Sequence, residues 1–230
     1  MKVRLKFTKL GDVRFISHLD LLRTFERALR RAEIPVAFTQ GFNPHPQITF
    51  AHPLSLGMTS EGEYVDLILG RDFSLKNLKE RLNHVFPQGI KVIDVVKVTD
   101  DRSVMSLVDA AMYELCISVD EGLKEDEVKE KLRKVLAKEK IVVLKKSKSK
   151  EELTDIRPFI YDISFKKLEG NTLYLTTLLA TGSRKNINPE VLLQYLRNDF
   201  ISFDPDFVKI HRIEIFSEKN GCFVPLLKVV

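Results

Sequence analysis

Cysteine is scarce in this sequence, and its placement excludes several kinds of protein. The two cysteines, Cys116 and Cys222, lie far apart, and neither belongs to a CxxC pair. A disulfide framework and a cysteine-based zinc or iron–sulfur site are therefore not expected. Such cysteine usage is typical of the reducing cytoplasm, where we expect the protein to be.

Long apolar runs are also absent. No run approaches the roughly 18 residues that a membrane helix needs, and 30% of the residues are charged. The first ten residues, MKVRLKFTKL, alternate charged and apolar side chains, whereas a signal peptide has a continuous apolar stretch. The sequence thus predicts a soluble protein without a membrane partner.

The common catalytic loops are missing as well. There is no Walker loop, no GxSxG and no GxGxxG, so nucleotide hydrolysis, serine hydrolase chemistry and dinucleotide binding lack support. The residues predict no cofactor, and an accessory role without catalysis of its own is favoured over an enzyme.

The sequence does contain enough apolar material for two domains. Its 230 residues are 44% hydrophobic, which fits two domains of roughly 100 to 120 residues each. The net charge of +5 is compatible with nucleic-acid binding but does not require it. Whether the protein is expected to bind nucleic acid therefore depends on how the charge is distributed along the sequence.

Hydrophobic periodicity predicts the same order of elements in both halves. In the first half, strands and helices are expected over residues 2–9, 17–33, 36–39, 47–51, 63–69, 75–85 and 90–98. In the second half they are expected over residues 112–119, 125–138, 141–145, 160–167, 173–179, 189–196 and 208–216, with a basic linker after residue 145 and an edge strand over 222–230. This order is the βαββαβ of ferredoxin-like domains. We predict an α+β fold of two tandem ferredoxin-like domains with antiparallel sheets, over residues 1–105 and 106–230.

The first predicted helix carries arginines opposite its apolar face. At 100° per residue they share an arc of roughly 100°; the set is Arg23, Arg27, Arg30 and Arg31, with Asp20 in the arc and Arg14 just before the helix. Because guanidinium groups bind phosphates through two parallel hydrogen bonds, this arc suits an RNA backbone. The alternative is an ordinary solvated face whose acidic residues offset part of the charge, but such a face usually includes lysine, and this one has none.

His18 falls on the apolar side of the same helix, at its start. A neutral imidazole there could serve as acid, base or ligand, and His18 and His45 are the candidate catalytic pair. The alternative is a core histidine bonded to a backbone carbonyl. A metal shared by His18, His45 and His52 is not expected, because their spacing matches no known ligand pattern.

The segment 41–46, GFNPHP, reads as a stiff polar loop in which two prolines hold Asn43 and His45. Rigid loops that present polar groups often form binding sites, and Phe42 could stack on a base. The alternative is a structural connection with Phe42 in the core.

Two further candidates lie in the second half. Asp155 and Arg157 are two positions apart, so on a strand they point the same way and either share a ligand or form a structural ion pair. Arg184 and Lys185 precede a predicted helix, where small and basic residues suit an anion; the alternative is a simple helix cap by Asn188. The run at residues 145–150 reads as a solvated basic loop that adds long-range attraction for RNA.

Several motifs resemble one bacterial family. RFISHLDLLRTFERALRRAEIPVAFTQGFNPHPQITFAHPLSLG, which begins at Arg14, is similar to the radical SAM-linked protein family, and DIRPFI at 155–160 and GSRKNINPEVLL at 182–193 look like its later motifs. The resemblance covers nearly the whole chain. It implies a domain of unknown function, fused to or encoded beside radical SAM proteins. It also implies a partner role in the modification of RNA, either tRNA or rRNA, or of the ribosome.

A weaker resemblance is to the ferredoxin-like RNA-binding proteins of CRISPR systems, including the repeat-processing endoribonucleases. It depends on the tandem βαββαβ order and on a histidine at the first helix, and the late glycine-rich loop of those proteins is not clear here. Three hypotheses therefore remain: an RNA-binding accessory module for a radical SAM enzyme, a ribonuclease or RNA-modifying enzyme that uses His18 and His45, and a protein-interaction module that docks a radical SAM partner.

Overall fold

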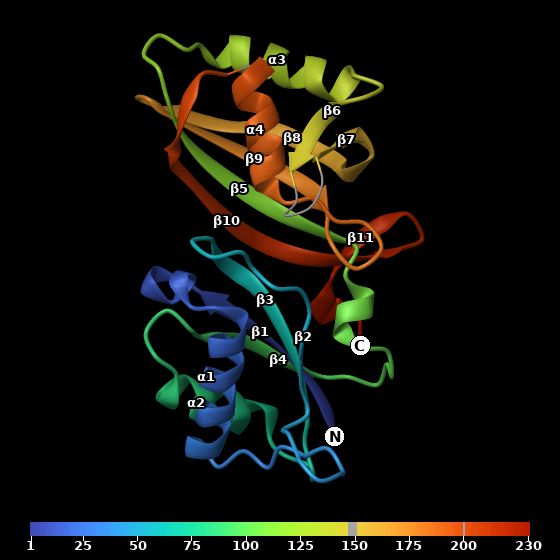
Figure 1. The fold of residues 1–230 in the computed structure, drawn as a ribbon. Helices are drawn as coiled ribbons and strands as arrows, with labels where there is room; N and C mark the ends of the chain where they lie inside the picture. The colour runs from blue at the N-terminus through green and yellow to red at the C-terminus, as the bar shows by residue number, and fades with distance from the viewer. Residues whose placement is uncertain (147–150, 200) are drawn as a thin grey trace. The chain divides into compact units, whose positions relative to one another are not determined.

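The computed structural model describes residues 1–146, 151–199 and 201–230. The chain forms two units, one of Met1–Asp109 with Arg212–Val230 and one of Ala110–His211. Across the described residues the protein is α+β, with four α-helices and mainly antiparallel strands (Figure 1). The predicted fold class is thus confirmed, and the tandem ferredoxin-like arrangement stays a prediction.

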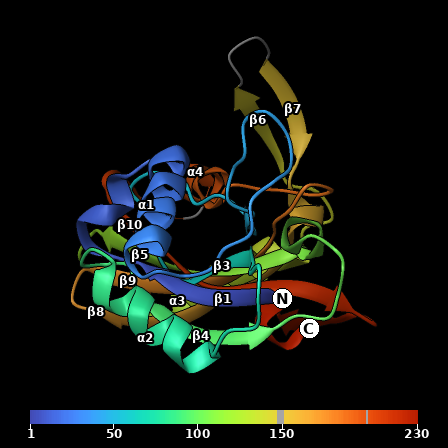
Figure 2. The same cartoon turned by 90° about the horizontal axis from the view of Figure 1, so that it is seen from below.

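The first unit contains three main strands and two helices. Its elements are β1 (Lys2–Lys9), α1 (His18–Arg31), β2 (Ile48–Phe50), β3 (Thr59–Ile68), α2 (Leu75–Val85) and β4 (Val92–Lys97), with 3-10 turns at Gly11–Phe15 and Val104–Leu107. β1 lies between β4 and β3 and pairs antiparallel with both, and β2 pairs with β3. The two helices contact each other (Figure 2). Residues 36–39 form isolated bridges instead of the predicted strand.

Alternate residues of β1 determine which face of this sheet the helices cover. Val3, Leu5 and Phe7 are fully buried in one apolar cluster with residues from both helices. From α1 the cluster takes residues spaced three and four apart, Leu21, Phe25, Ala28 and Leu29. The helix is therefore held by one face, and its opposite face is turned to solvent.

Two buried ion pairs also lie in the first unit, one of them, Arg4–Asp66, on the face of β1 and β3 that the helices do not cover. Arg4 donates to both carboxylate oxygens of Asp66, at 2.7 and 3.0 Å, and to two carbonyl groups near the end of the chain. Arg212 donates to both carboxylate oxygens of Glu63, at 2.8 and 2.7 Å. Both arginines are at most 1% exposed, so each charge depends on its partner.

The long strand β10 (Phe203–Lys219) returns the end of the chain to the first unit. The Ser60 hydroxyl donates to the Arg212 carbonyl at 3.0 Å. Gly62 lies so close to the strand that a Cβ would be 2.5 Å from the Ile213 carbonyl oxygen. The predicted domains over residues 1–105 and 106–230 do not include this return of the chain. Alternating apolar residues predict that a segment is a strand, but they do not predict which strands it pairs with.

The predicted edge strand over 222–230 is only partly correct. β11 (Cys222–Pro225) pairs with the end of β10, and a 3-10 turn at Leu226–Lys228 follows it. The strand ends at a proline, which has no amide hydrogen to extend the ladder.

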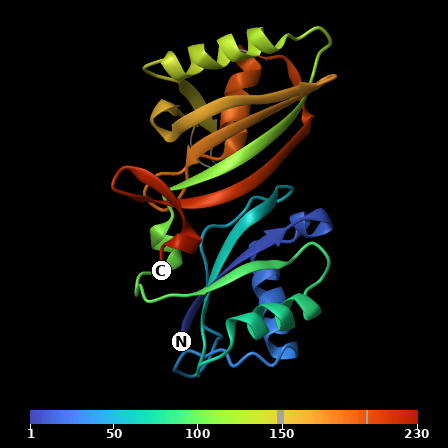
Figure 3. The same cartoon turned by 180° about the vertical axis from the view of Figure 1, so that it is seen from behind.

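The second unit contains β5 (Ala110–Val119), α3 (Glu125–Ala137), β6 (Val142–Lys146), β7 (Glu151–Asp155), β8 (Ile160–Glu169), β9 (Thr172–Ala180) and α4 (Pro189–Asp199). β9 pairs antiparallel with β5 and with β8. Alternate residues of β5 and β9 are buried, and α3 packs on β8 (Figure 3).

The strands β6 and β7 form a separate two-stranded sheet. The predicted basic linker KKSKSKEE, residues 145–152, is therefore wrong over residues 151–152, where β7 begins. The segment EELTD has one apolar residue, Leu153, which lies opposite Leu144 across the ladder. A single apolar residue gives too little alternation to reveal a strand. The middle of the predicted basic loop, residues 147–150, lies outside the described residues.

Within the described ranges, no helix is long and apolar enough to cross a membrane.

His52 should make the stability of the first unit depend on pH. Its backbone carbonyl accepts from Arg212 at 3.0 Å. Burial, followed by the Arg212 charge, lowers the pKa of His52 to about 4, although Glu63 opposes this. The unfolded chain, with a pKa of about 6.5, binds the proton more readily. The stability from the neutral imidazole is therefore complete above pH 6.5 and is lost as the pH falls toward 4, by about 3 kcal/mol.

We expect the midpoint of urea unfolding to fall between pH 7 and pH 4.5, and His52→Gln to reduce this fall. His84→Gln, at an exposed position on α2, is the matched control and should keep the wild-type profile. Equal pH dependence in the His52 variant and the wild type would show that His52 has no such role.

Candidate nucleic-acid interface

Helix α1 begins with a full cap. The Ser17 hydroxyl accepts from the Asp20 amide at 3.1 Å and donates to the Asp20 carboxylate at 2.7 Å. That hydrogen bond, together with the nearby Arg23 charge, lowers the pKa of Asp20. The predicted Ser17 cap is confirmed. Asp20 lies in the arginine arc and also takes part in capping the N-terminus of the helix.

One face of α1 presents four guanidinium groups, from Arg23, Arg27, Arg30 and Arg31, which we call the arginine face. All four residues are exposed, opposite the buried apolar positions. Arg23 lies 3.3 Å from Asp20. Within the described part of the chain, the other three form no hydrogen bond or ion pair through their side chains, so most of this charge is available to a ligand.

The positive charge continues onto α2. Arg31, Arg81 and His84 line a cavity of about 390 Å³, and two acidic residues, Glu33 and Glu80, line it as well. Arg81 is held in place by the Ala32 carbonyl, at 3.4 Å, and by the Phe73 ring, 5.7 Å from its guanidinium carbon. Sequence reasoning missed Arg81, because only the packing of the two helices brings it beside α1.

The GFNPHP loop presents its aromatic residue to solvent. Phe42 is fully exposed, so the alternative that placed it in the core is wrong. The loop is closed where Thr39 and His45 exchange hydrogen bonds at 2.9 and 3.0 Å. Asn43 is also exposed. An exposed ring on a braced loop is available to stack on a base.

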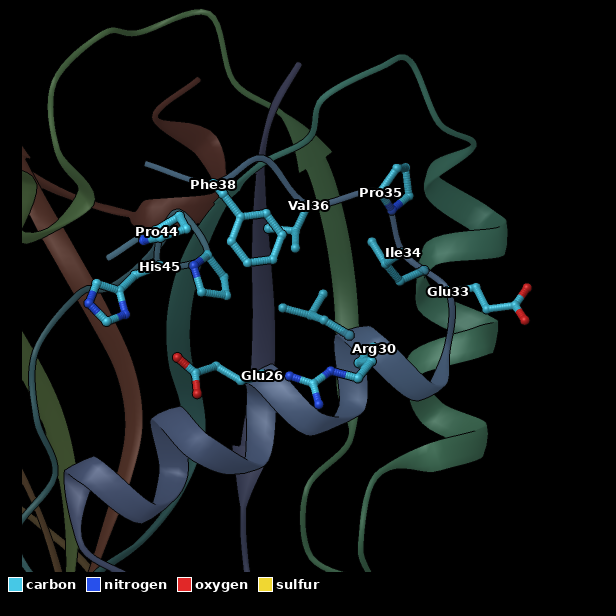
Figure 4. Close-up of a pocket in the computed structure, with 11 residues that line it drawn as sticks. Glu26, Arg30, Glu33, Ile34, Pro35, Val36, Phe38, Pro44 and His45 are labelled. Atoms are coloured by element: carbon cyan, nitrogen blue, oxygen red, sulfur yellow. The ribbon is translucent and has the colours of Figure 1, made fainter. Parts of the chain in front are cut away.

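A cavity of about 560 Å³ lies between this segment and the end of α1. Its lining includes Glu26 and Arg30 of the helix and Phe38, Pro44 and His45 of the segment. Figure 4 shows the Phe38 ring across the space from Glu26 and Arg30. The lining of the cavity thus combines an aromatic surface, the carboxylates of Glu26 and Glu33, and the guanidinium group of Arg30.

The two candidate catalytic histidines have different surroundings. His18 is exposed at the first turn, and its ring meets Phe50 edge-on with centroids 5.3 Å apart. His45 lines the cavity with Glu26 and Arg30, and His18 is not among the residues that line it. The structure does not bring them together. Among the described residues, no group of His, Cys, Asp or Glu could hold a metal ion.

Three of the remaining predicted residues, Arg14, Asp155 and Arg157, make local contacts. The Arg14 guanidinium lies 4.6 Å from the Phe15 ring centre. Asp155 ends β7 and accepts from the Ile141 and Arg157 amides at 2.8 and 3.1 Å, which lowers the pKa of its carboxyl group.

The Arg157 side chain caps a helix. It lies in a 3-10 turn after β7 and donates to the carbonyls of Leu136 and Lys138 at the end of α3, at 2.8 and 3.1 Å. The prediction of a shared strand face with Asp155 is wrong, because the chain turns between the two residues. Cations at a helix C-terminus stabilise the helix.

Arg184 and Lys185 are exposed in the segment before α4. The Asn188 side chain accepts from the Glu190 amide at 3.1 Å, which is the simple cap that the sequence allowed. The anion site at these two residues stays a prediction.

The fold and this surface define an α+β protein with a basic helical face. Residues 2–189 match the family described as an uncharacterized protein conserved in bacteria (DUF2344). The chain belongs to this family. Among curated proteins, none matches the sequence.

Three solved structures resemble the chain in fold. A Cbf5–Nop10–Gar1 complex has 11% identity and a TM-score of 0.55, over 94% of this chain and 50% of the matched one. A chain of an H/ACA ribonucleoprotein bound to a substrate RNA containing 2'-deoxyuridine has 10% identity and a TM-score of 0.50, over 95% of this chain and 49% of the matched one. A chain of the archaeal box H/ACA Nop10–Cbf5 complex has 8% identity and a TM-score of 0.49, over 91% of this chain and 46% of the matched one. The chain spans about half the length of these matched chains, and such low identities show the fold alone.

Proposed function

We propose that this protein binds RNA through the arginine face of α1 and the exposed ring of Phe42. The observation that carries this proposal is the set of four exposed guanidinium groups on one helix face, three of them without partners in the described part of the chain. Arginine forks match phosphate geometry, and an exposed aromatic ring stacks on bases without regard to sequence. The likeness in fold to a chain of an H/ACA ribonucleoprotein bound to a substrate RNA also supports RNA binding.

The finer part of the proposal is that the protein acts with a radical SAM enzyme in the modification of RNA or of the ribosome. Its support is the resemblance of residues 14–57 and of the two later motifs to the radical SAM-linked proteins. In the same proposal, both units are ferredoxin-like domains, and the chain recognises RNA while the partner supplies the chemistry.

Salt dependence tests the binding directly. If four arginines neutralise four phosphates of a single strand, the logarithm of affinity falls with the logarithm of salt at a slope of about −3. Between about 50 and 200 mM salt the affinity should then drop by about 50-fold. Fluorescence anisotropy with labelled single-stranded RNA measures both values. No binding at the lowest salt, or binding that salt does not weaken, would refute the proposal.

Capture from a bacterial lysate separates the proposal from its alternatives. RNA recovered with the protein, and lost after ribonuclease treatment, supports it. Recovery of a protein partner alone would favour the protein-interaction module, with the same arginines bound to acidic side chains. Cleavage of the captured RNA that His18→Ala or His45→Ala abolishes would favour a ribonuclease.

A further inference from the structure

Three charged residues line the cavity beside α1, Glu26, Arg30 and Glu33, and the Glu33 carboxylate points away from the other two side chains (Figure 4). Glu26 and Arg30 are one helical turn apart and both line the cavity, a spacing at which opposite charges often pair. Within the described part of the chain, neither side chain forms a hydrogen bond or an ion pair. Their acceptor and donor groups are therefore left to whatever enters the cavity.

An aromatic surface faces these two side chains. Phe38 is 54% exposed and lines the cavity together with the rings of Pro44 and His45 (Figure 4). The Phe38 carbonyl accepts from the Gln47 side chain at 3.0 Å, so its backbone is fixed. A flat apolar surface that is held in place suits the face of a nucleobase.

We propose that this cavity binds one unpaired guanine base of the RNA. Guanine carries two adjacent donors, N1–H and the 2-amino group, and a carboxylate accepts both at once. It also carries the acceptors O6 and N7, which are the usual partners of arginine. Phe38 stacks on the base, Glu26 takes the donor edge and Arg30 takes an acceptor. Uracil and adenine lack the paired donors.

This inference depends on the proposed function, because the phosphates that flank the base bind the rest of the arginine face. Arg27 and Arg31 each come one position after a cavity residue along the helix, Glu26 and Arg30 respectively. When a base occupies the cavity, the phosphates on either side of it in the RNA strand therefore lie near these two guanidinium groups.

The test uses fluorescein-labelled twelve-residue oligouridines with one central substitution, measured by anisotropy on the full chain. We expect the guanine oligomer to bind about tenfold more tightly than the adenine or all-uracil oligomers. Inosine, which lacks the 2-amino group, should lose much of that gain. Glu26→Gln should remove the guanine preference and still bind oligouridine.

Glu80→Gln, at an exposed position of α2, removes one negative charge and is the matched control. It should keep the guanine preference. Phe38→Ala should weaken the guanine oligomer about tenfold, with an unchanged circular dichroism spectrum. Equal affinity for all the oligomers, or a preference that survives in Glu26→Gln, would overturn the guanine site and leave RNA binding standing. Failure of every oligomer to bind would overturn both proposals.

Discussion

Changing Arg23, Arg27 and Arg31 together to glutamate should lower RNA affinity at least about 100-fold at 50 mM salt. The three residues follow one ridge of α1 at intervals of four, about 6 Å apart along the axis. Each change removes a phosphate contact and adds a repulsion. All three side chains are exposed, so the helix should fold as before. Anisotropy with a single-stranded RNA gives the affinity, and circular dichroism gives the helix content.

A charge-matched control separates this surface from net charge. Lys91, Lys97 and Lys228 are exposed in the same unit but lie outside α1. Changing them to glutamate alters the net charge by the same amount. We expect that variant to lose only a few-fold in affinity through long-range attraction. If both variants lost affinity equally, the positive charge of the whole protein would be responsible and the arginine face would have no special role.

The arginine face could be predicted because every step is local in sequence. Ser17 and Asp20 mark the start of the helix, and a spacing of three and four assigns Phe25 and Leu29 to the buried side. The structure places α1 at His18–Arg31, against a predicted 17–33. The helix over 75–85 agrees with α2 at both ends.

The cavity could not be predicted in this way. Glu26 read as one of the acids that offset the basic stripe, and Phe38 read as part of a short strand. They meet because the segment after the helix folds back over it. Two backbone hydrogen bonds hold this segment: the Ala37 amide donates to the Ile68 carbonyl at 2.7 Å, and the Gly70 amide donates to the Pro35 carbonyl at 2.8 Å. Such a return depends on tertiary packing, which a helical or strand period does not encode.

Arg157 is a second case in which tertiary packing decides the role of a residue that the sequence singles out. Its position two residues after Asp155 suggested a shared ligand, whereas its side chain reaches back by about twenty residues to the end of α3. The spacing of Asp155 and Arg157 can be seen in the sequence. That Arg157 caps α3 cannot, because this depends on which element lies near it in the fold. A basic residue beside an acid is thus a weaker functional signal than an arginine face on one helix.

The second large effect should come from the buried pair beneath the interface. Asp66→Asn leaves the Arg4 charge, which is 0% exposed, without a counter-ion, and also removes the Lys2 contact at 3.5 Å. Stranding a buried charge costs about 3–5 kcal/mol. For a chain of this length the melting temperature should then fall by roughly 10 °C. Calorimetry or circular dichroism measures the shift.

Asp72→Asn, at an exposed site in the same unit, is the matched control and should melt like the wild type. A second variant, Arg4→Met with Asp66→Leu, removes both charges and should recover part of the loss, because apolar side chains of similar size often replace a buried pair without penalty. Full recovery is not expected, since Arg4 also binds the carbonyls of Leu226 and Val229. An Asp66→Asn protein as stable as the wild type would show that those carbonyls alone hold the arginine. Below its melting temperature the variant should still bind RNA, because α1 packs on the opposite face of β1.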